Sequence, residues 1–234
     1  MNNNATGFER EPITTIHLMR HGEVDNPDGI LYGRLPGYRL SELGEQMAEQ
    51  VARYFEERTA EAGPITAVIT SPLLRAQQSG APTAAAFGLE ATTDERLIES
   101  GNSFEGMPVN RNPLALAKPK YWWRYRNPLR PSWGESYSDQ ALRMVAAVRD
   151  ILHANPGGEV LVVSHQLPIW LLRRWLERRV LWHDPRRREC SLASLTTLRF
   201  EGETLISLSY REPAGGLLGE ARDMVPGTSG AEIN

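Results

Sequence analysis

An arginine and a histidine stand side by side, followed by a glycine, at the end of a short apolar segment, "ITTIHLMRHGE". Two kinds of chemistry fit this arrangement. His17, His21 and Glu23 are residue types that bind metal ions. Alternatively, Arg20 could hold a phosphoryl group while His21 acts as the nucleophile that receives it.

The metal interpretation depends on the distance between the two histidines. Residues 13–19 have the β-branched, apolar composition of a strand. On an extended strand His17 and His21 would lie about 13 Å apart, whereas a metal ion is only about 2 Å from each ligand. We therefore expect no metal site here, and we expect His17 to be a core histidine with satisfied hydrogen bonds.

Two more apolar segments end in residues suited to phosphate. "ITAVITSPLLRA" places Ser71 and Arg75 after one segment, and "EVLVVSH" places His165 after another. In open parallel sheets, ligands bind at the carboxyl ends of the strands. The sequence therefore predicts that two arginines and two histidines converge at one edge of a sheet.

The segments between these strands have helical periodicity, which predicts crossover connections. Ser41 is a suitable N-cap for the first helix, and Pro82 is expected to kink or restart the second. We predict a three-layer α/β/α sandwich with a mostly parallel central sheet. Strands are expected at 13–19, 65–70 and 159–164, a weaker one at 92–97, a hairpin at 191–210, and helices at 41–60, 71–88, 136–154 and 168–179.

One domain is expected, because the 234 residues can form a single large core. We assign residues 1–12 to an N-terminal tail and residues 13–211 to the catalytic domain. Residues of about 100–135 form an irregular cap insertion, since glycine and proline punctuate them. The Gly-rich residues 212–234 are expected to be a mobile tail.

Composition narrows the function classes. A net charge of −3 gives no basic field for nucleic acid. No segment approaches the roughly 18 apolar residues of a membrane span, and no signal peptide is visible. The single cysteine, Cys190, excludes an internal disulfide and is expected to be a small buried hydrophobe. We expect a soluble, cytoplasmic protein.

Five segments in this order, "LMRHGE", "SPLLRA", "ERLIES", "GES" and "VVSH", resemble the histidine phosphatase, or phosphoglycerate-mutase-like, superfamily. The resemblance runs from about Ile13 to Tyr210. It implies a phosphohistidine mechanism with no metal or other cofactor. It implies that His21 is the nucleophile and that Arg20, Arg75 and His165 hold the phosphoryl group.

The leaving group also needs a proton, and the resemblance implies that Glu99 supplies it. The surroundings of Glu99 depart from the family pattern, because Phe104 replaces a tryptophan and the spacing is one residue longer. Glu105 and Glu135 therefore remain alternative acids, and Glu99 could instead pair with a surface cation.

Four further residues are candidates for substrate binding. Asn26 and Arg34 match family positions that often line the phosphate pocket, although both also suit ordinary loop roles. Gln166 replaces a glycine after the second histidine and could contact substrate at the mouth of the pocket. Glu135 is the fourth candidate.

Two further segments are rich in charged residues. Residues 118–133, rich in tryptophan, tyrosine and arginine, could cap the pocket, form a homodimer contact or, less well, bind nucleic acid. The run from Asp184 to Glu189, with three arginines, has the composition of a solvated mixed-charge loop.

These observations predict a metal-independent phosphatase that hydrolyses a small phosphorylated metabolite, without nucleic acid or membrane partners. Two alternatives are a phosphoglycerate mutase, which needs the same phosphate site, and a non-catalytic module that binds phosphorylated ligands. A binding module has no need of a nucleophile, and the presence of His21 therefore counts against it.

Overall fold

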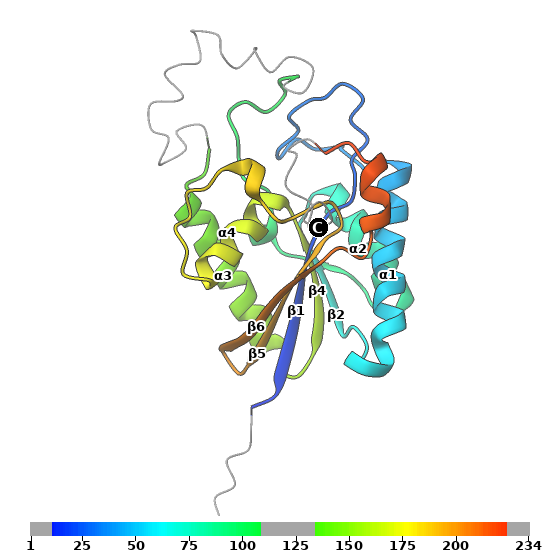
Figure 1. Cartoon of the computed structure of the whole chain (residues 1–234), viewed down its shortest axis with the longest axis vertical. Helices are drawn as coiled ribbons and strands as arrows, with labels where there is room; N and C mark the ends of the chain where they lie inside the picture. The colour runs from blue at the N-terminus through cyan, green and yellow to red at the C-terminus, as the bar shows by residue number, and fades with distance from the viewer. Residues whose placement is uncertain (1–10, 109–133, 224–234) are drawn as a thin grey trace, which may run out of the picture.

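The structure, a computed structural model, describes residues 11–108 and 134–223. Its strands alternate with helices along the chain as far as β4, and a hairpin follows α4 (Figure 1). The strands are β1 (Ile13–Arg20), β2 (Ala67–Thr70), β3 (Thr92–Thr93), β4 (Glu159–Ser164), β5 (Leu195–Glu201) and β6 (Thr204–Arg211). The helices are α1 (Glu42–Ala62), α2 (Leu74–Ala86), α3 (Tyr137–Ala154) and α4 (Gln166–Leu176), with 3-10 helices η1 (Glu95–Leu97), η4 (Pro185–Arg187) and η5 (Gly215–Glu220).

These strands form one mixed sheet in the order β3-β2-β4-β1-β5-β6. β3, β2, β4 and β1 are parallel, whereas β5 is antiparallel to β1 and forms a hairpin with β6. Helices α3 and α4 lie on one face, and α1 and α2 lie on the other (Figure 1). The predicted three-layer sandwich with a mostly parallel sheet is therefore confirmed.

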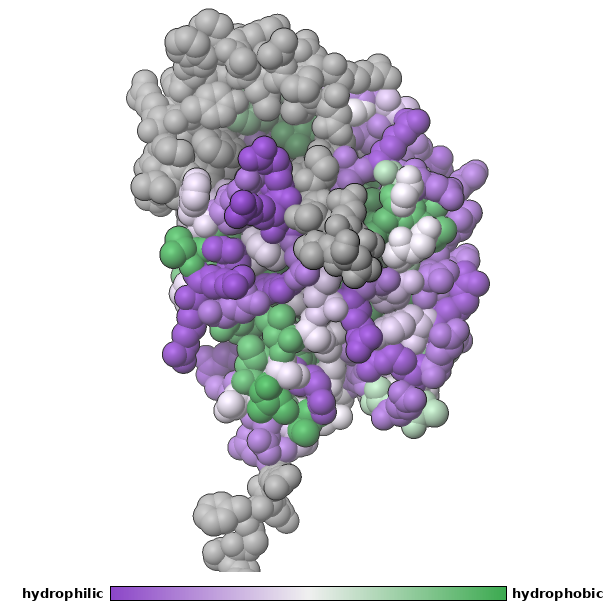
Figure 2. Space-filling view, viewed as in Figure 1, coloured by the Kyte–Doolittle hydropathy of each residue, from purple (hydrophilic) through white to green (hydrophobic). Residues whose placement is uncertain are grey.

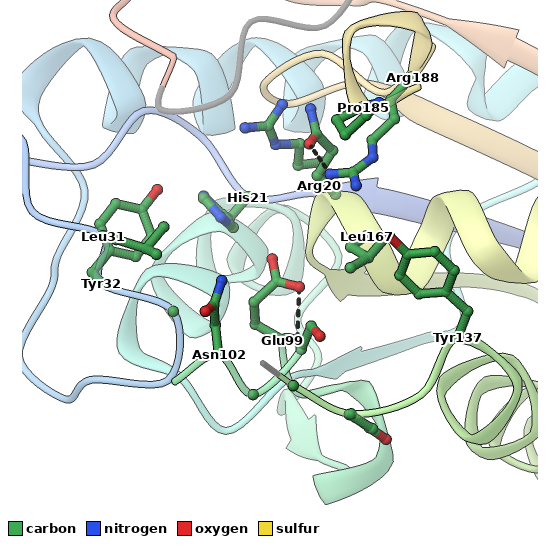
Figure 3. A pocket seen from close by; sticks show the side chains of 16 residues that line it. Arg20, His21, Leu31, Tyr32, Glu99, Asn102, Tyr137, Leu167, Pro185 and Arg188 are labelled. Atoms are coloured by element: carbon green, nitrogen blue, oxygen red, sulfur yellow. Dashed lines mark hydrogen bonds between the residues drawn. The ribbon is translucent and has the colours of Figure 1, made fainter. Parts of the chain in front are cut away.

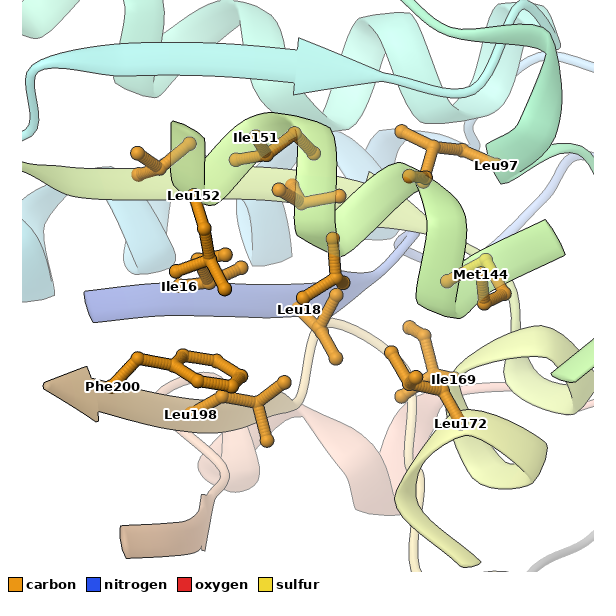
Figure 4. Close-up of a cluster of buried hydrophobic side chains, with 14 of the residues drawn as sticks. Ile16, Leu18, Leu97, Met144, Ile151, Leu152, Ile169, Leu172, Leu198 and Phe200 are labelled. Carbon is orange, nitrogen blue, oxygen red and sulfur yellow. The ribbon is translucent and has the colours of Figure 1, made fainter. Parts of the chain in front are cut away.

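Two cores form because successive side chains of a strand point to opposite faces of the sheet. Ile16 and Leu18 of β1 pack with Met144 and Ile151 of α3 (Figure 4). Met19, also on β1, packs on the other face with residues of α1 and α2. A parallel sheet covered in this way is apolar on both sides, which explains the nearly continuous apolar runs in the sequence.

His17 is the polar exception on β1. It is buried, its Nε2 lies 2.8 Å from Oε1 of Glu159, and its Nδ1 lies 2.9 Å from the Thr197 hydroxyl. The prediction of a core histidine with satisfied hydrogen bonds is confirmed.

Gly22 and Gly44 join the end of β1 to the first turn of α1. A Cβ atom on Gly22 would lie 2.6 Å from the carbonyl oxygen of Gly44, and one on Gly44 would collide with the carbonyl oxygen of Glu23. Ser41 caps the same turn by accepting a hydrogen bond from the Gly44 amide (3.0 Å). The two backbones can approach this closely only because both residues lack a side chain.

Two expectations about the helices need correction. α2 does not restart at Pro82 but continues through it as one helix, in which a single N–H donor is missing. α2 also begins at Leu74, so Ser71 and Pro72 belong to the loop that precedes it.

The tail boundary is also wrong. Residues 212–223 pack against the domain: Ala214 is buried in the core beside α1 and α2, and η5 follows it. The amide of Arg222 donates to the Glu23 carboxylate (2.6 Å), and Asp223 pairs with Arg20. The glycine-rich composition of this segment gives no indication of these contacts. The proposed tails at 1–10 and 224–234 and most of the cap, 109–133, lie outside the described residues.

The face drawn in Figure 2 is mostly hydrophilic, with hydrophobic side chains gathered over the β5–β6 hairpin. Ile206 of β6, the edge strand, is about half exposed. Among the described residues, none of the helices has the length and hydropathy to cross a membrane. The homodimer contact suggested for residues 118–133 stays a prediction.

The Gly22–Gly44 contact generates a testable prediction. Gly44→Ala should lower the free energy of unfolding by about 1–3 kcal/mol, because the added methyl group forces β1 and α1 apart. Gly219→Ala is the matched control, since a Cβ atom there meets nothing within 4 Å. Urea denaturation of both variants measures the difference, and equal stabilities would show that the contact tolerates a side chain.

Candidate active site

The two histidines meet because β1 and β4 are parallel neighbours in register. Arg20, the last residue of β1, lies opposite Ser164, the last residue of β4. His21 and His165 therefore leave the sheet side by side, with ring centroids 5.2 Å apart. Arg75 reaches the same place from the first turn of α2, after β2. The predicted convergence at the strand ends is confirmed.

His21 is held as a neutral base. Its Nδ1–H donates to the backbone carbonyl of Gly22 (2.7 Å), and its Nε2 accepts a hydrogen bond from Nε of Arg75 (3.3 Å). Burial, and then the positive charges of Arg75 and Arg20, hold the pKa of His21 well below its usual range. The lone pair is thus on Nε2, beside a guanidinium group.

Arg75 is almost fully buried and rigidly held. Its Nη2 donates to the carbonyl oxygen of Gly33 (2.7 Å), and its guanidinium group lies over the ring of Tyr32, 4.7 Å from the centroid. Arg75 has no carboxylate partner among the described residues. A positive charge buried in this way favours an anionic ligand next to His21.

His165 has one ring nitrogen available for a ligand. Its Nε2 lies 2.8 Å from the hydroxyl oxygen of Ser71, and its buried Nδ1 has no hydrogen-bond partner within the described part of the chain. If the Ser71 hydroxyl donates to Nε2, the proton of neutral His165 is on Nδ1. That N–H could then donate to a phosphoryl oxygen.

Arg20 is positioned by the C-terminal segment. Asp223 accepts two hydrogen bonds, from Nη1 (2.7 Å) and Nη2 (2.6 Å), and the carbonyl oxygen of Cys190 accepts another from Nη1 (2.8 Å). Nε has no partner among the described residues. The Nε–H and the second Nη2–H lie on one edge of the guanidinium plane, so a phosphoryl group can still bind two parallel donors.

These groups border a cavity of about 230 Å³ at the carboxyl end of the sheet (Figure 3). Arg20, His21 and Glu99 are among the residues that line it, while Arg75 and His165 lie behind His21. Both polar and apolar side chains line it. The other lining residues are Leu31, Tyr32, Gly33, Ser100, Gly101, Asn102, Gly134, Glu135, Tyr137, Gln166, Leu167, Pro185 and Arg188.

The three candidate acids have different surroundings. Glu105 lies outside the cavity wall, and its Oε1 accepts from the amides of Arg34 and Asn102. Glu135 lines the cavity, but its carboxylate is paired with both Arg34 and Arg143. Two arginines thus already occupy the Glu135 carboxylate.

Glu99 has no such ion pair among the described residues. Within the described residues its carboxyl group accepts one hydrogen bond, from the amide of Ser100 (2.7 Å), and extends into the cavity toward His21 (Figure 3). Geometry therefore favours Glu99 as the acid and argues against the alternative in which it only pairs with a surface cation.

Two predicted substrate-binding residues do not line the cavity. Asn26 exchanges hydrogen bonds with the backbone of Ile30, which is the loop role left open above. Arg34 binds the carbonyl oxygen of Glu99 (2.6 Å) and the carboxylate of Glu135, so it positions the acidic wall instead. Gln166 and Glu135 do line the cavity, as predicted.

The sequence gives no sign that Arg188 and Asp223 belong to the site. The mixed-charge interpretation of residues 184–189 holds for Arg186, which is exposed and paired with Asp184, but Arg188 is only 7% exposed and lines the cavity. Arg186 and Arg187 are both exposed, so no periodicity distinguishes the buried Arg188 from them. Cys190 is buried, as predicted, and burial raises the pKa of its thiol to about 11.

Among the described residues, no group of three or more histidine, cysteine, aspartate or glutamate side chains could hold a metal ion. His17 and His21 bind different partners, as described above. The residues in and beside the cavity supply a neutral imidazole, arginine donors and a carboxyl group.

A parallel α/β sheet with a neutral histidine and surrounding arginines at its carboxyl end holds the groups that phosphoryl transfer requires. The chain belongs to the histidine phosphatase superfamily (branch 1), whose family model matches residues 16–212.

Its similarity to known proteins spans most of its length. It is 51% identical over 201 residues to an uncharacterized protein of Mycobacterium tuberculosis, Rv0525, covering 86% of this chain and 97% of that protein. It is 31% identical to a protein of Enterobacter sp. named "Probable phosphoglycerate mutase GpmB", covering 77% and 83%. The fold matches the structure of the mycobacterial glucosyl-3-phosphoglycerate phosphatase with a TM-score of 0.65, at 24% identity and with 85% and 96% coverage.

The Arg20–Asp223 pair generates a second prediction. Asp223→Ala should lower kcat/KM for a phosphomonoester about 10-fold or more, because a buried guanidinium loses the carboxylate that orients it. Glu220→Ala, at an exposed position of η5, is the control and should change little. Wild-type activity in Asp223→Ala would mean that Arg20 needs no carboxylate, and an improved KM would mean that Asp223 competes with phosphate.

Proposed function

We propose that this protein is a metal-independent phosphatase that hydrolyses a small phosphomonoester through a phosphohistidine on His21. The observation that carries the proposal is the fixed neutral form of His21, with Nδ1–H bound to the Gly22 carbonyl and Nε2 beside Arg75. A binding module would need the arginines but not a nucleophilic nitrogen.

In the first step, Nε2 of His21 attacks phosphorus in line with the bond to the leaving oxygen. The N–P bond forms as the P–O bond breaks, and Glu99 gives its proton to the leaving alcohol. Arg20 and Arg75 neutralise the charge on the phosphoryl oxygens, and Nδ1–H of His165 donates to one of them.

In the second step, water enters on the face that the alcohol has left. The Glu99 carboxylate takes a proton from the water as the oxygen attacks phosphorus. The N–P bond breaks, His21 returns to its neutral form, and inorganic phosphate leaves. Every proton lost by Glu99 in the first step is thus recovered in the second.

A mutase is the second candidate, because the Enterobacter relative bears that name. A mutase must transfer the phosphoryl group back to a bound acid before water reaches it. The two functions share His21, so the assay must follow the products. We favour hydrolysis because the loop after Gly22 reaches α1 within about twenty residues and leaves no long segment there to close the cavity.

The test measures phosphate release from a panel of sugar phosphates, phosphoglycerates, phosphoamino acids and nucleotides, in the presence of a chelator. Wild-type protein should release phosphate from at least one compound, and His21→Ala, folded by circular dichroism, should not. Acid quenching should trap a base-stable, acid-labile phosphoramidate. Rapid interconversion of 3- and 2-phosphoglycerate with negligible phosphate release would instead identify a mutase, and a requirement for added divalent metal would refute the role of the arginines.

Glu99→Gln tests the acid. Its kcat/KM should fall about 10²–10⁴-fold for alkyl phosphates, whose leaving oxygen needs a proton, and much less for p-nitrophenyl phosphate, which leaves without one. Glu105→Gln is the matched control, since that carboxylate lies outside the cavity wall. Equal losses on both substrates would assign Glu99 a structural role.

A further inference from the structure

Arg188 is held at the wall of the cavity by neutral groups only. Its Nε donates to Nε2 of His183 (2.8 Å), and its Nη1 donates to Oε1 of Gln166 (3.1 Å). His183 in turn donates from Nδ1 to the carbonyl oxygen of Leu181 (2.7 Å). Figure 3 shows the guanidinium group extending from Arg188 into the cavity, on the side of Leu167 and Tyr137.

The hydrogen bonds from Leu181 through His183 to Arg188 fix the orientation of the guanidinium group. Burial lowers the pKa of His183 to about 4, so its ring is neutral near pH 7 and can accept from Arg188. Tyr137 and Trp170 pack against the same ring, with centroids 5.6 and 5.9 Å away. The side chain is thus preorganised before any ligand binds.

The positive charge of Arg188 has no ion pair within the described part of the chain, although the residue is only 7% exposed. Nη2 has no hydrogen-bond partner there either. Residues 109–133 contain no aspartate or glutamate that could supply a carboxylate. Of the charged groups that face Arg188, Glu99 attracts it and Arg20 repels it, and Glu99 is already assigned to proton transfer.

Burying an unpaired guanidinium group costs free energy, unless an anion binds to it. Arg20, Arg75 and His165 already supply donors for the transferred phosphoryl group, so Arg188 remains for another anionic group of the ligand. We propose that Arg188 binds a second anionic group of the substrate, a carboxylate, so that the preferred substrate is a phosphorylated carboxylic acid. This proposal rests on the proposed function and adds the substrate class to it.

Charge balance favours a carboxylate over a second phosphate. One guanidinium with a single unoccupied terminal nitrogen matches a singly charged group, whereas a phosphate dianion would keep excess charge in a wall that Leu31, Leu167 and Pro185 make apolar.

Matched substrate pairs test the proposal. Phosphoserine and phosphoethanolamine, phosphoglycolate and methyl phosphate, and 3-phosphoglycerate and ethylene glycol monophosphate differ within each pair by the carboxylate alone. Wild-type protein should prefer the carboxylate member of at least one pair about 10- to 100-fold in kcat/KM, as expected for a charge-assisted hydrogen bond. Arg188→Met should abolish that preference and leave the other member within about threefold.

Two more variants separate the recognition of charge from a role in folding. Arg187→Met removes an exposed arginine of η4 and should keep the preference. Gln166→Glu places a carboxylate beside the intact guanidinium, and the internal ion pair should abolish the preference as Arg188→Met does. A preference retained in Gln166→Glu and in folded Arg188→Met would overturn the proposal.

Binding to the His21→Ala variant, measured by calorimetry with the same pairs, makes the proposal independent of turnover. If no compound is hydrolysed but the carboxylate preference in binding depends on Arg188, the proposed function fails and the second-anion site stands. If phosphate is released without any preference within a pair, the proposed function stands and the site fails. A preference confined to propane-1,3-diol bisphosphate over its monophosphate, lost in Arg188→Met, would replace the carboxylate with a second phosphate.

Discussion

The parallel pairing of β1 with β4 is the constraint on which the site depends. Register alone sets Arg20 opposite Ser164, and the residues that follow each strand must then share one small volume. A shift by one residue would turn Ile16 and Leu18 away from α3 and move His21 to the other side of the sheet. The two hydrophobic cores therefore hold the catalytic geometry as well as the fold.

The local charge at the cavity depends on which of its arginines have a carboxylate partner. Arg34 and Arg20 have carboxylate partners: Arg34 positions Glu135 in the wall, and Asp223 orients Arg20. Arg75 and Arg188 have none among the described residues, and both are buried. An anionic ligand beside such buried, unpaired cations would relieve unfavourable charge, because the groups that would bind it are already oriented.

The parts of this site that sequence reveals are those governed by local rules. Arg20, His21 and His165 follow apolar strands, and the rule for parallel sheets brings strand ends together. No local pattern in the sequence predicts the position of Asp223, because its pairing with Arg20 depends on the packing of Ala214 and η5 against α1. Arg188 is hidden among three consecutive arginines that differ only in burial. The preference for Glu99 over Glu135 as the acid depends on the ion pairs of Glu135, which residue spacing does not reveal.

The pairing of Arg20 with Asp223 joins residues 203 positions apart in the chain. Synthesis proceeds from the N-terminus, so β1 emerges long before the carboxylate that orients Arg20. The orientation of Arg20 is therefore acquired only after residues 214–223, which also complete the second core, have been synthesised.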